Sequence, residues 1–310
     1  MDLKIEFSDK EITPWGGMVL MKELIKRTKI NELLKDIGLP NQKSNRGYDP
    51  IQLINNFWVG IWSGANRYEH LEVTRHDRVI RRMFGWRRMP GHKAFQRYFR
   101  KFGQADNDRV FTALFKWFFN QIRFDNYTLD VDSTVMPGYG RQQGARRGYN
   151  PRKPGRASHH PLVAFIPELR MAANFWLRSG DTHTTNNVYG FMENTFEKLE
   201  GKKTGLLRAD SGFYDRKILE YPEDRNINYI ISARFYGPLK LAMARHKAYV
   251  RLDSGIEMAG TVYKSPLWDK ERRFIIVRQE IRLRPPGRPA NSLSCSGRRS
   301  FTGTTGTASS

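Results

Sequence analysis

The stretch Thr128-Leu129-Asp130-Val131-Asp132-Ser133-Thr134 decides the fold of this chain. Its apolar and polar residues alternate with the period of a β-strand, so Asp130 and Asp132 lie on one face of that strand. A second stretch, Leu207-Arg208-Ala209-Asp210-Ser211-Gly212-Phe213, predicts an apolar strand that ends in an aspartate and a glycine turn. Strand ends of this kind are the usual place for a functional site in an α/β sheet. We therefore expect both strands to belong to one sheet.

Strand and helix patterns alternate around these two stretches. The predicted strands are at 127–131, 162–166, 171–177, 205–210 and 229–232. Helices are predicted at 188–199 and 216–220, where apolar residues recur at helical spacing. The β pattern returns after residue 248, and its last run, 277–283, alternates strictly, which predicts a half-exposed strand. The expected fold class is α/β, with a mixed sheet over 121–238 and a β-rich segment over 239–286.

The two ends of the chain differ from this middle part. Residues 1–120 have a helical pattern, which is clearest after Asp49-Pro50, where an N-cap and a proline at the first position precede apolar residues at helical spacing. Residues 287–310 are rich in Gly, Ser and Thr, contain no acid and show no periodicity. Such a segment buries too little apolar surface to fold. We expect a helical region over 1–120 and a disordered, non-native tail over 287–310.

Composition limits the class of protein. Lys and Arg number 53 against 31 Asp and Glu, a net charge of +22, which predicts a polyanionic partner. The hydrophobic fraction of 39% is enough for a core, so this charge decorates a globular protein. The only cysteine, Cys295, excludes disulfides and cysteine-ligated metal sites and fits a reducing compartment. Because no apolar run approaches the roughly 18 residues of a membrane span, we expect a cytoplasmic protein that acts on nucleic acid.

The two aspartate-bearing strands predict a metal site. An isolated Asp-x-Asp pair most often faces solvent and catalyses nothing. A second aspartate at the end of another strand favours a site, because converging carboxylates are what Mg²⁺ (or Mn²⁺) requires. Because the protein is strongly basic, we expect its substrate to be a nucleic acid. Mg²⁺ ions held by these carboxylates would then activate water or a 3′-hydroxyl to attack a phosphodiester. Asp132 and Asp210 therefore predict a nuclease or a strand-transfer enzyme.

Two basic segments are the candidate DNA contacts. Residues 75–101 hold ten Lys and Arg but one acid, Asp77, and the second segment follows Asp132 directly. A local excess of this size favours contact with phosphates, although many charge runs are only solvated faces. Charge next to Asp132 is expected to guide the DNA strand. The candidate DNA-binding residues are Arg87, Arg88, Lys93, Arg97, Arg100, Lys101, Arg141, Arg146, Arg147, Arg152, Lys153 and Arg156.

Taken together and in this order, the motifs resemble the insertion-sequence transposases of the Asp-Asp-Glu type. The resemblance rests on residues 129–134, Gly140-Arg141-Gln142-Gln143-Gly144-Ala145 with Gly148-Tyr149-Asn150-Pro151, His160-Pro161-Leu162 and residues 207–213, and it covers most of residues 1–286. It implies an RNase H-like core with a β-rich insertion, behind a helical DNA-binding region. It also implies that Asp132 and Asp210 are the first two catalytic residues and hold Mg²⁺ (or Mn²⁺).

The chain departs from this family at the third carboxylate. The resemblance implies a glutamate on a helix beyond the insertion, but the last acid of this sequence is Glu280. Glu280 falls on the arginine-bearing face of an alternating strand, where a solvated ion pair is expected. After Pro286 the sequence resembles out-of-frame or foreign translation. We therefore expect a C-terminally truncated enzyme with little or no activity.

The function implied by the resemblance is that of a DNA transposase. Such a protein binds double-stranded DNA at terminal inverted repeats and at the target, with a homodimer on DNA as one assembly, and catalyses Mg²⁺-dependent strand cleavage and transfer. Two alternatives stay open. One is a non-catalytic DNA-binding protein or inhibitor that occupies transposon ends, and the other is an RNase H-like nuclease unrelated to transposition.

Overall fold

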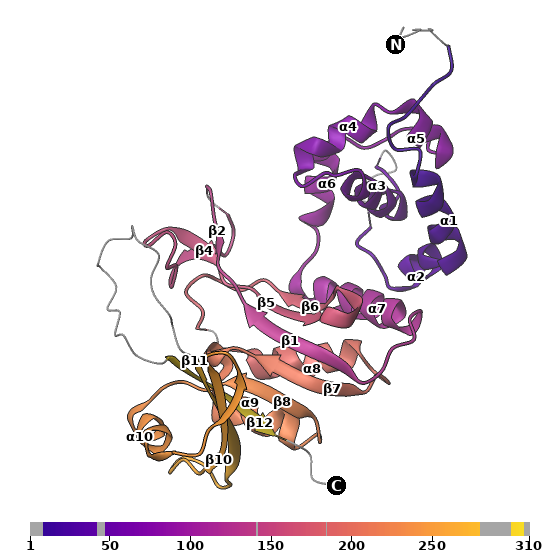
Figure 1. The fold of residues 1–310 in the computed structure, drawn as a ribbon. Helices are drawn as coiled ribbons and strands as arrows, with labels where there is room; N and C mark the ends of the chain where they lie inside the picture. Colours follow the sequence, from indigo (N-terminus) through magenta and orange to yellow (C-terminus); the bar gives the residue numbers. More distant parts are fainter. Residues whose placement is uncertain (1–8, 42–46, 141, 184, 280–298, 307–310) are drawn as a thin grey trace, which may run out of the picture. The chain divides into compact units, whose positions relative to one another are not determined.

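The computed structural model describes residues 9–41, 47–140, 142–183, 185–279 and 299–306. The chain divides into two compact units, Met1–Trp117 and Phe118–Ser310, which are treated separately below. In Figure 1 the first unit runs from indigo to purple and the second from magenta to yellow. No helix among the described residues is long and apolar enough to cross a membrane.

The first unit is helical, as predicted. Its helices are α1 (Met18–Thr28), α2 (Ile30–Asp36), α3 (Pro50–Trp62), the 3₁₀ turn η1 (Tyr68–His70), α4 (Leu71–Arg75), α5 (Arg78–Met83), α6 (His92–Phe99) and most of α7 (Gln104–Asn120). Helix α3 begins as the Asp49-Pro50 pair predicts, because the Asp49 carboxylate accepts a hydrogen bond of 2.9 Å from the main-chain N–H of Gln52. Leu53 and Val59 of α3 are fully buried and anchor the helices around it.

A mixed sheet forms the centre of the second unit. Its core strands are β1 (Tyr127–Ser133), β5 (Leu162–Ile166), β6 (Met171–Trp176), β7 (Thr204–Ala209) and β8 (Asn228–Ser232). They lie in the order β6-β5-β1-β7-β8, with β1 antiparallel to β5 and parallel to β7. Strand β1 is an inner strand because it pairs on both sides, and Tyr127, Leu129 and Val131 are all buried on one face, as the alternation predicts. This confirms the expected fold class: helices followed by a mixed α/β sheet.

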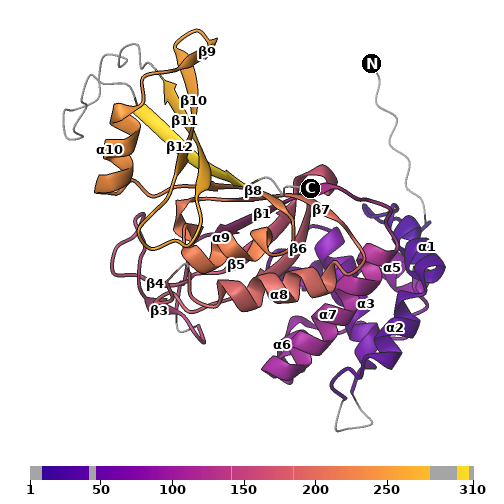
Figure 2. The same cartoon turned by 90° about the horizontal axis from the view of Figure 1, so that it is seen from below.

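Two helices cover the buried face of this sheet. Helix α8 (Val188–Lys198) packs against β5 and β6, and α9 (Arg216–Glu223) packs against β8 and α8. Figure 2 shows α8 and α9 next to each other along the sheet. The fully buried ring of Phe191 and the buried side chain of Leu219 fill this layer. Each helix follows one strand and leads to the next, which is how β7 and β8 come to run parallel to β1.

A β-rich segment extends the same sheet beyond β8. It contains α10 (Gly237–Arg245), β9 (Val250–Asp253), β10 (Ile256–Tyr263) and β11 (Arg272–Gln279), with β10 antiparallel to both β9 and β11. The expected strand at 277–283 is described only to Gln279, and Glu280 lies outside the described residues. Part of the expected disordered tail instead forms β12 (Arg299–Gly306), which pairs with β8 and β11. Backbone hydrogen bonds need no apolar periodicity, which explains the difference.

A buried ion pair ties the β-rich segment to α9. Arg272 of β11 donates to both oxygens of Glu223, at 2.7 and 2.9 Å, and the two side chains are only 2% and 12% exposed. Burial raises the pKa of Glu223, but the hydrogen bonds from Arg272, Lys270 and Tyr229 outweigh it and hold that pKa below its ordinary value of 4.5. The guanidinium of Arg272 also lies 4.6 Å from the ring centre of Trp268. These contacts fix the orientation of β11 against the core.

We expect Glu223→Gln to destabilise the chain by about 3–5 kcal/mol at neutral pH, because the change leaves Arg272 buried beside a neutral partner. The pKa of Glu223 is lower in the folded state, so its contribution is present above about pH 4.5 and is lost as the pH falls through the folded pKa. The difference in unfolding free energy between wild type and variant should therefore shrink in acid. Urea unfolding at a series of pH values measures it.

Glu220→Gln is the matched control, because Glu220 pairs with Arg216 on the exposed side of the same helix. This exposed pair contributes less than about 0.5 kcal/mol. An equal loss of stability in both variants would contradict the role of the buried pair.

Candidate active site

Asp132 and Asp210 occupy equivalent positions on neighbouring parallel strands. The last pair in the β1–β7 ladder is Val131 with Ala209. The residue that follows Val131 is Asp132, and the residue that follows Ala209 is Asp210. Adjacent strands lie about 4.8 Å apart, and both aspartates are exposed at the same edge of the sheet. The strand register therefore places the two aspartates that the sequence analysis selected at adjacent positions.

An ion pair two residues before the aspartates, between the same two strands, indicates the side of the sheet on which they lie. Arg208 of β7 donates from Nε and Nη2 to the two carboxylate oxygens of Asp130, each at 2.6 Å. The hydrogen bonds to Asp130 raise the pKa of Arg208 above its usual value. Because side chains two residues apart share a face, Asp132 and Asp210 project on the same side as this pair. The pairing also distinguishes the two acids of the Asp-x-Asp stretch, since Asp130 is paired with a cation and Asp132 has no cationic partner among the described residues.

Each of the two aspartates is oriented by one main-chain N–H. Oδ1 of Asp132 accepts from Ser133 at 2.7 Å, and Oδ1 of Asp210 accepts from Gly212 at 2.8 Å. Among the described residues, Oδ2 of neither carboxylate has a hydrogen-bond partner. Two oriented carboxylates with free, solvent-facing oxygens are a donor set that suits a hard divalent cation. No group of three or more His, Cys, Asp and Glu side chains that could hold a metal is present in the part of the chain that the structure describes.

The turn that follows Asp210 is held by an arginine that the sequence analysis did not identify. Arg234 lies just after β8 and donates from Nε to the carbonyl of Ser211 at 2.8 Å and from Nη2 to that of Gly212 at 3.1 Å. Both residues belong to the 3₁₀ turn η3 (Ser211–Phe213), in which the N–H of Gly212 orients Asp210. The sequence has no signal for this contact, because the acceptors are main-chain carbonyls and β8 must first pair with β7.

The second basic cluster surrounds a small sheet of three strands. These strands are β2 (Met136–Pro137), β3 (Arg146–Arg147) and β4 (Ala157–His159), in the order β2-β4-β3. A close backbone contact anchors the sheet, since a Cβ atom on Gly180 would lie 2.2 Å from the carbonyl oxygen of Ser158. The described basic residues of the cluster are all exposed: Arg146, Arg147, Arg152, Lys153 and Arg156. Arg146 lies 3.6 Å from Asp181, and Arg141 lies outside the described residues.

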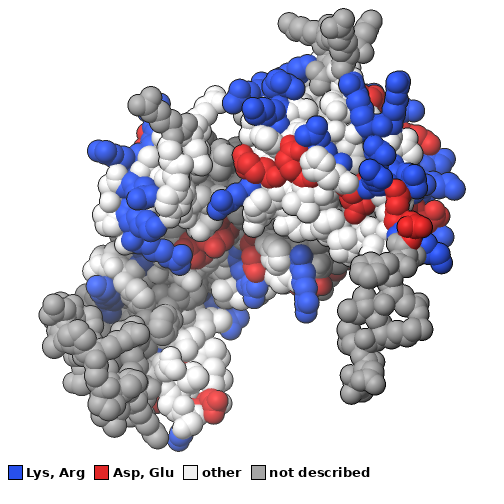
Figure 3. All heavy atoms as spheres, turned by 90° about the horizontal axis from the view of Figure 1, so that it is seen from above, with Lys and Arg blue, Asp and Glu red and all other residues white. Residues whose placement is uncertain are grey.

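The first basic cluster belongs to the helical unit, on α6 and the loops that flank it. Two of its residues have structural contacts: Arg88 lies 4.4 Å from the ring centre of Tyr48, and Lys101 donates to the carbonyl of Asn41 at 3.0 Å. Four exposed residues make no side-chain hydrogen bond, ion pair or ring contact within the described part of the chain: Arg87, Lys93, Arg97 and Arg100. On the face shown in Figure 3, Lys and Arg are visibly more abundant than Asp and Glu.

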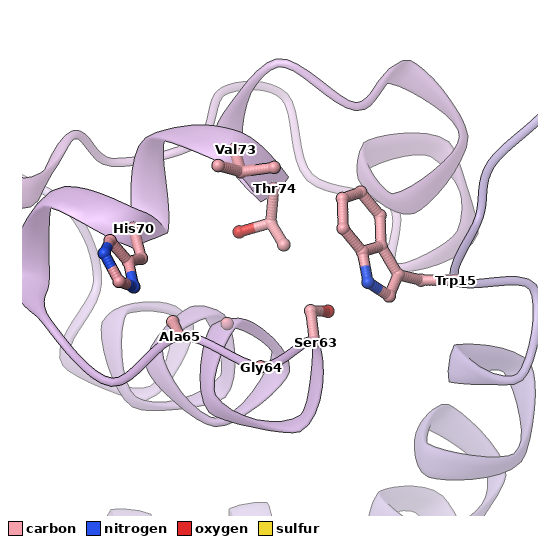
Figure 4. Close-up of a pocket in the computed structure, with 8 residues that line it drawn as sticks. Trp15, Ser63, Gly64, Ala65, His70, Val73 and Thr74 are labelled. Carbon is pink, nitrogen blue, oxygen red and sulfur yellow. The ribbon is translucent and has the colours of Figure 1, made fainter.

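The helical unit contains a pocket of about 160 Å³, shown in Figure 4. Its lining includes Trp15, Ser63, His70 and Thr74. No Asp or Glu lies among the residues that line it, so it does not suit a metal ion. The exposed carboxylates of Asp132 and Asp210 therefore remain the candidate site.

Residues 1–284 match the sequence profile of a family described as transposase DDE domain group 1. No curated protein matches the sequence. Among solved structures, the chain is similar to the piggyBac transposase in its synaptic complex with hairpin DNA, at 12% identity and a TM-score of 0.41, over 93% of this chain and 59% of that one. The chain thus spans 59% of the length of that transposase chain.

Two further similar structures are complexes of one transposase. The Mos1 paired-end complex with the left transposon end is 8% identical with a TM-score of 0.24, over 67% of this chain and 66% of that one. The Mos1 strand transfer complex is 9% identical with a TM-score of 0.23, over 72% of each chain.

We expect Arg234→Ala to weaken Mn²⁺ binding at Asp210 about tenfold, because a residue that orients a ligand typically affects affinity by that amount or more. The affinity for Mn²⁺ is measured by titration with magnetic-resonance detection of the free ion. The thermal midpoint should change little, because Arg234 is exposed. Arg234→Lys should restore part of the affinity.

The matched control is Arg245→Ala. Arg245 is an exposed arginine at the end of α10 and has no partner among the described residues. It should leave Mn²⁺ binding unchanged. An Arg234→Ala variant with unaltered affinity would show that the turn keeps its geometry without this side chain.

Proposed function

The chain belongs to the family of transposase DDE domains, group 1, and from this membership we propose that it is a DNA transposase whose reaction takes place at Asp132 and Asp210. The observation that supports this proposal is the parallel register of β1 and β7, which aligns the two aspartates at one edge of the sheet. The free carboxylate oxygens face solvent, where a DNA backbone has access to them.

DDE transposases act with divalent metal ions, and Asp132 and Asp210 fit the ligand chemistry of Mg²⁺ or Mn²⁺. Their oxygens are the hard donors that these ions prefer, and neither carboxylate is engaged by a cationic side chain among the described residues. The chemistry that such ions supply when bound is activation of a water or 3′-hydroxyl nucleophile and stabilisation of the leaving oxygen. We assign the two aspartates to holding the ions.

The remaining residues of the site have supporting roles in this proposal. Asp130 neutralises Arg208, which keeps that guanidinium away from the carboxylate of Asp132. Arg234 acts as a positioning residue for Asp210 through the turn that it holds. Glu280, the last acid of the sequence, lies outside the described residues and is tested separately below as a third carboxylate.

We further propose that the exposed basic residues bind DNA phosphates. Lys93 and Arg97 lie on α6 in the helical unit. Arg147 and Arg152 lie in the segment that follows Asp132 and contains the small sheet, called the excursion below. Phosphate contacts of this kind position a protein on DNA without reading its sequence. Within the proposal, the helical unit contacts transposon ends and the second cluster guides the strand to be cut.

We expect weak Mn²⁺ binding and feeble cleavage of end-containing DNA, because two carboxylates without a third leave the ions under-neutralised. Asp132→Asn and Asp210→Asn should each abolish what binding there is. Asp224→Asn, an exposed aspartate at the end of α9, is the matched control and should bind as wild type does. Mn²⁺ titration and cleavage assays measure both properties.

Two outcomes would contradict this assignment. Metal binding that survives both aspartate changes would place the ions elsewhere. Robust cleavage that Glu280→Gln abolishes would show that the third carboxylate is present in this chain.

We expect DNA affinity to fall steeply with salt, because each neutralised phosphate contributes about 0.9 to the slope of log K against log salt concentration. Replacing Lys93, Arg97 and Arg100 together by Gln should reduce this slope by about 2.7 if each makes one phosphate contact. Fluorescence anisotropy with labelled duplex DNA at a series of salt concentrations measures the slope.

The matched control replaces three exposed basic residues of the second unit, Lys240, Arg245 and Lys247, by Gln. Both triple variants lose the same charge, so a specific interface predicts a smaller slope only for the first. Equal reductions would mean that total charge, and not the α6 cluster, drives binding.

A further inference from the structure

The small sheet β2-β4-β3 continues directly from the strand that bears Asp132. Strands β1 and β5 are paired antiparallel, with Ser133 opposite Leu162, and the same two chain segments pair again as β2 and β4, with Met136 opposite His159. Between the two ladders, the Thr134 N–H donates to the carbonyl of Pro161 at 3.3 Å. The small sheet is therefore attached at the end of β1 where Asp132 lies.

Tyr139 stands at the end of this ladder between two cations. The Gly138 N–H donates to the carbonyl of Ala157 at 2.9 Å. The two segments are antiparallel, so Tyr139, which follows Gly138, lies beside Arg156, which precedes Ala157. The guanidinium carbon of Arg156 lies 4.7 Å from the centre of the Tyr139 ring. Lys153 Nζ donates to the Tyr139 hydroxyl at 2.6 Å and lowers the pKa of that hydroxyl.

These distances show which part of the ring is open. Lys153 Nζ is 5.0 Å from the ring centre but 2.6 Å from the hydroxyl, so it lies beyond the hydroxyl edge and covers no face. The guanidinium of Arg156 lies against the ring at stacking distance. The side chain is nevertheless 66% exposed, so a ring face remains open to solvent. An exposed aromatic ring flanked by positive charge is unlike a packing contact.

The chemistry of this arrangement matches an unpaired nucleobase. Every base has a π-face that stacks on an aromatic ring, and each such contact contributes about 1–3 kcal/mol. The two cations beside the ring match the phosphates on either side of a stacked base. A base inside a duplex is paired and stacked on its neighbours, so the ring can reach only a base that is already out of the helix.

We propose that Tyr139, together with Arg156 and Lys153, is a stacking platform for an unpaired base of the DNA that is cut. This inference rests on the proposed function, because it takes DNA at Asp132 as given. The chain from Asp132 to Tyr139 spans at most about 23 Å when extended. At about 3.4 Å per nucleotide of duplex, this places the base within roughly seven nucleotides of the reacting phosphate.

The test uses the full chain and two DNA probes that contain 2-aminopurine, whose fluorescence falls when it stacks. In one probe the analogue lies in a single-stranded overhang of about seven nucleotides, and in the other it is paired in a blunt duplex of the same sequence. We expect wild type to quench the overhang probe, and Tyr139→Ala to lose the quenching and bind that probe about 5- to 150-fold more weakly. Tyr139→Trp should keep both properties.

The matched control is Tyr149→Ala, because Tyr149 is a tyrosine of the same excursion, 73% exposed, with no ring contact or hydrogen bond among the described residues. It should leave quenching unchanged. Blunt-duplex affinity should be the same for all these variants, which separates the platform from general DNA binding.

Each remaining outcome has a defined meaning. Tyr139→Ala with undiminished quenching, or an equal loss in Tyr149→Ala, would overturn the platform while duplex binding leaves the proposed function standing. Failure of wild type to bind either probe would overturn both.

Discussion

The parallel pairing of β1 with β7 is the constraint on which the candidate site depends. Asp132 and Asp210 are far apart in the chain, and only the register that pairs Val131 with Ala209 aligns them. A slip of one residue would turn one of the two aspartates to the opposite face. The buried side chains of Leu129 and Leu207 oppose such a slip, because it would expose them. Core packing and site geometry are thus set by the same hydrogen-bonded ladder.

The charged side chains around this ladder have different partners. Asp130 and Arg208 neutralise each other, so one acid of the Asp-x-Asp stretch supports the site and the other remains available to a ligand. Among the described residues, Arg234 donates to main-chain carbonyls alone, so it can orient Asp210 without competing for its carboxylate. On the other side, the β1–β5 ladder extends into the small sheet, which adds Arg156 and Lys153 next to an exposed ring. In our proposal, the aspartate that holds a metal ion on β1 and the basic residues that contact phosphates on the small sheet are therefore close to each other along the chain.

Much of this arrangement could be predicted from local patterns. The alternation in residues 128–134 predicted β1 and its buried face, and the Asp49-Pro50 pair predicted the start of α3, because both signals act within a few residues. Asp210 was identified because an apolar strand that ends in an acid and a glycine is a local pattern as well. The contact of Arg234, by contrast, could not be predicted from a sequence pattern, because its acceptors are main-chain carbonyls and every residue type has one. Strand β12 was missed for the same reason, because main-chain pairing does not require apolar alternation.

The sequence by itself determined the family, the fold class and the positive charge, and it proposed the two candidate aspartates, since each of these depends on residue type and short-range spacing. Only the tertiary structure decided that β7 lies parallel to β1, that Asp130 is neutralised by Arg208, and that Tyr139 stands between Arg156 and Lys153. The physical reason is that these contacts join residues distant in the chain. Their partners are selected by loop closure and by the packing of the whole sheet, which no local pattern records.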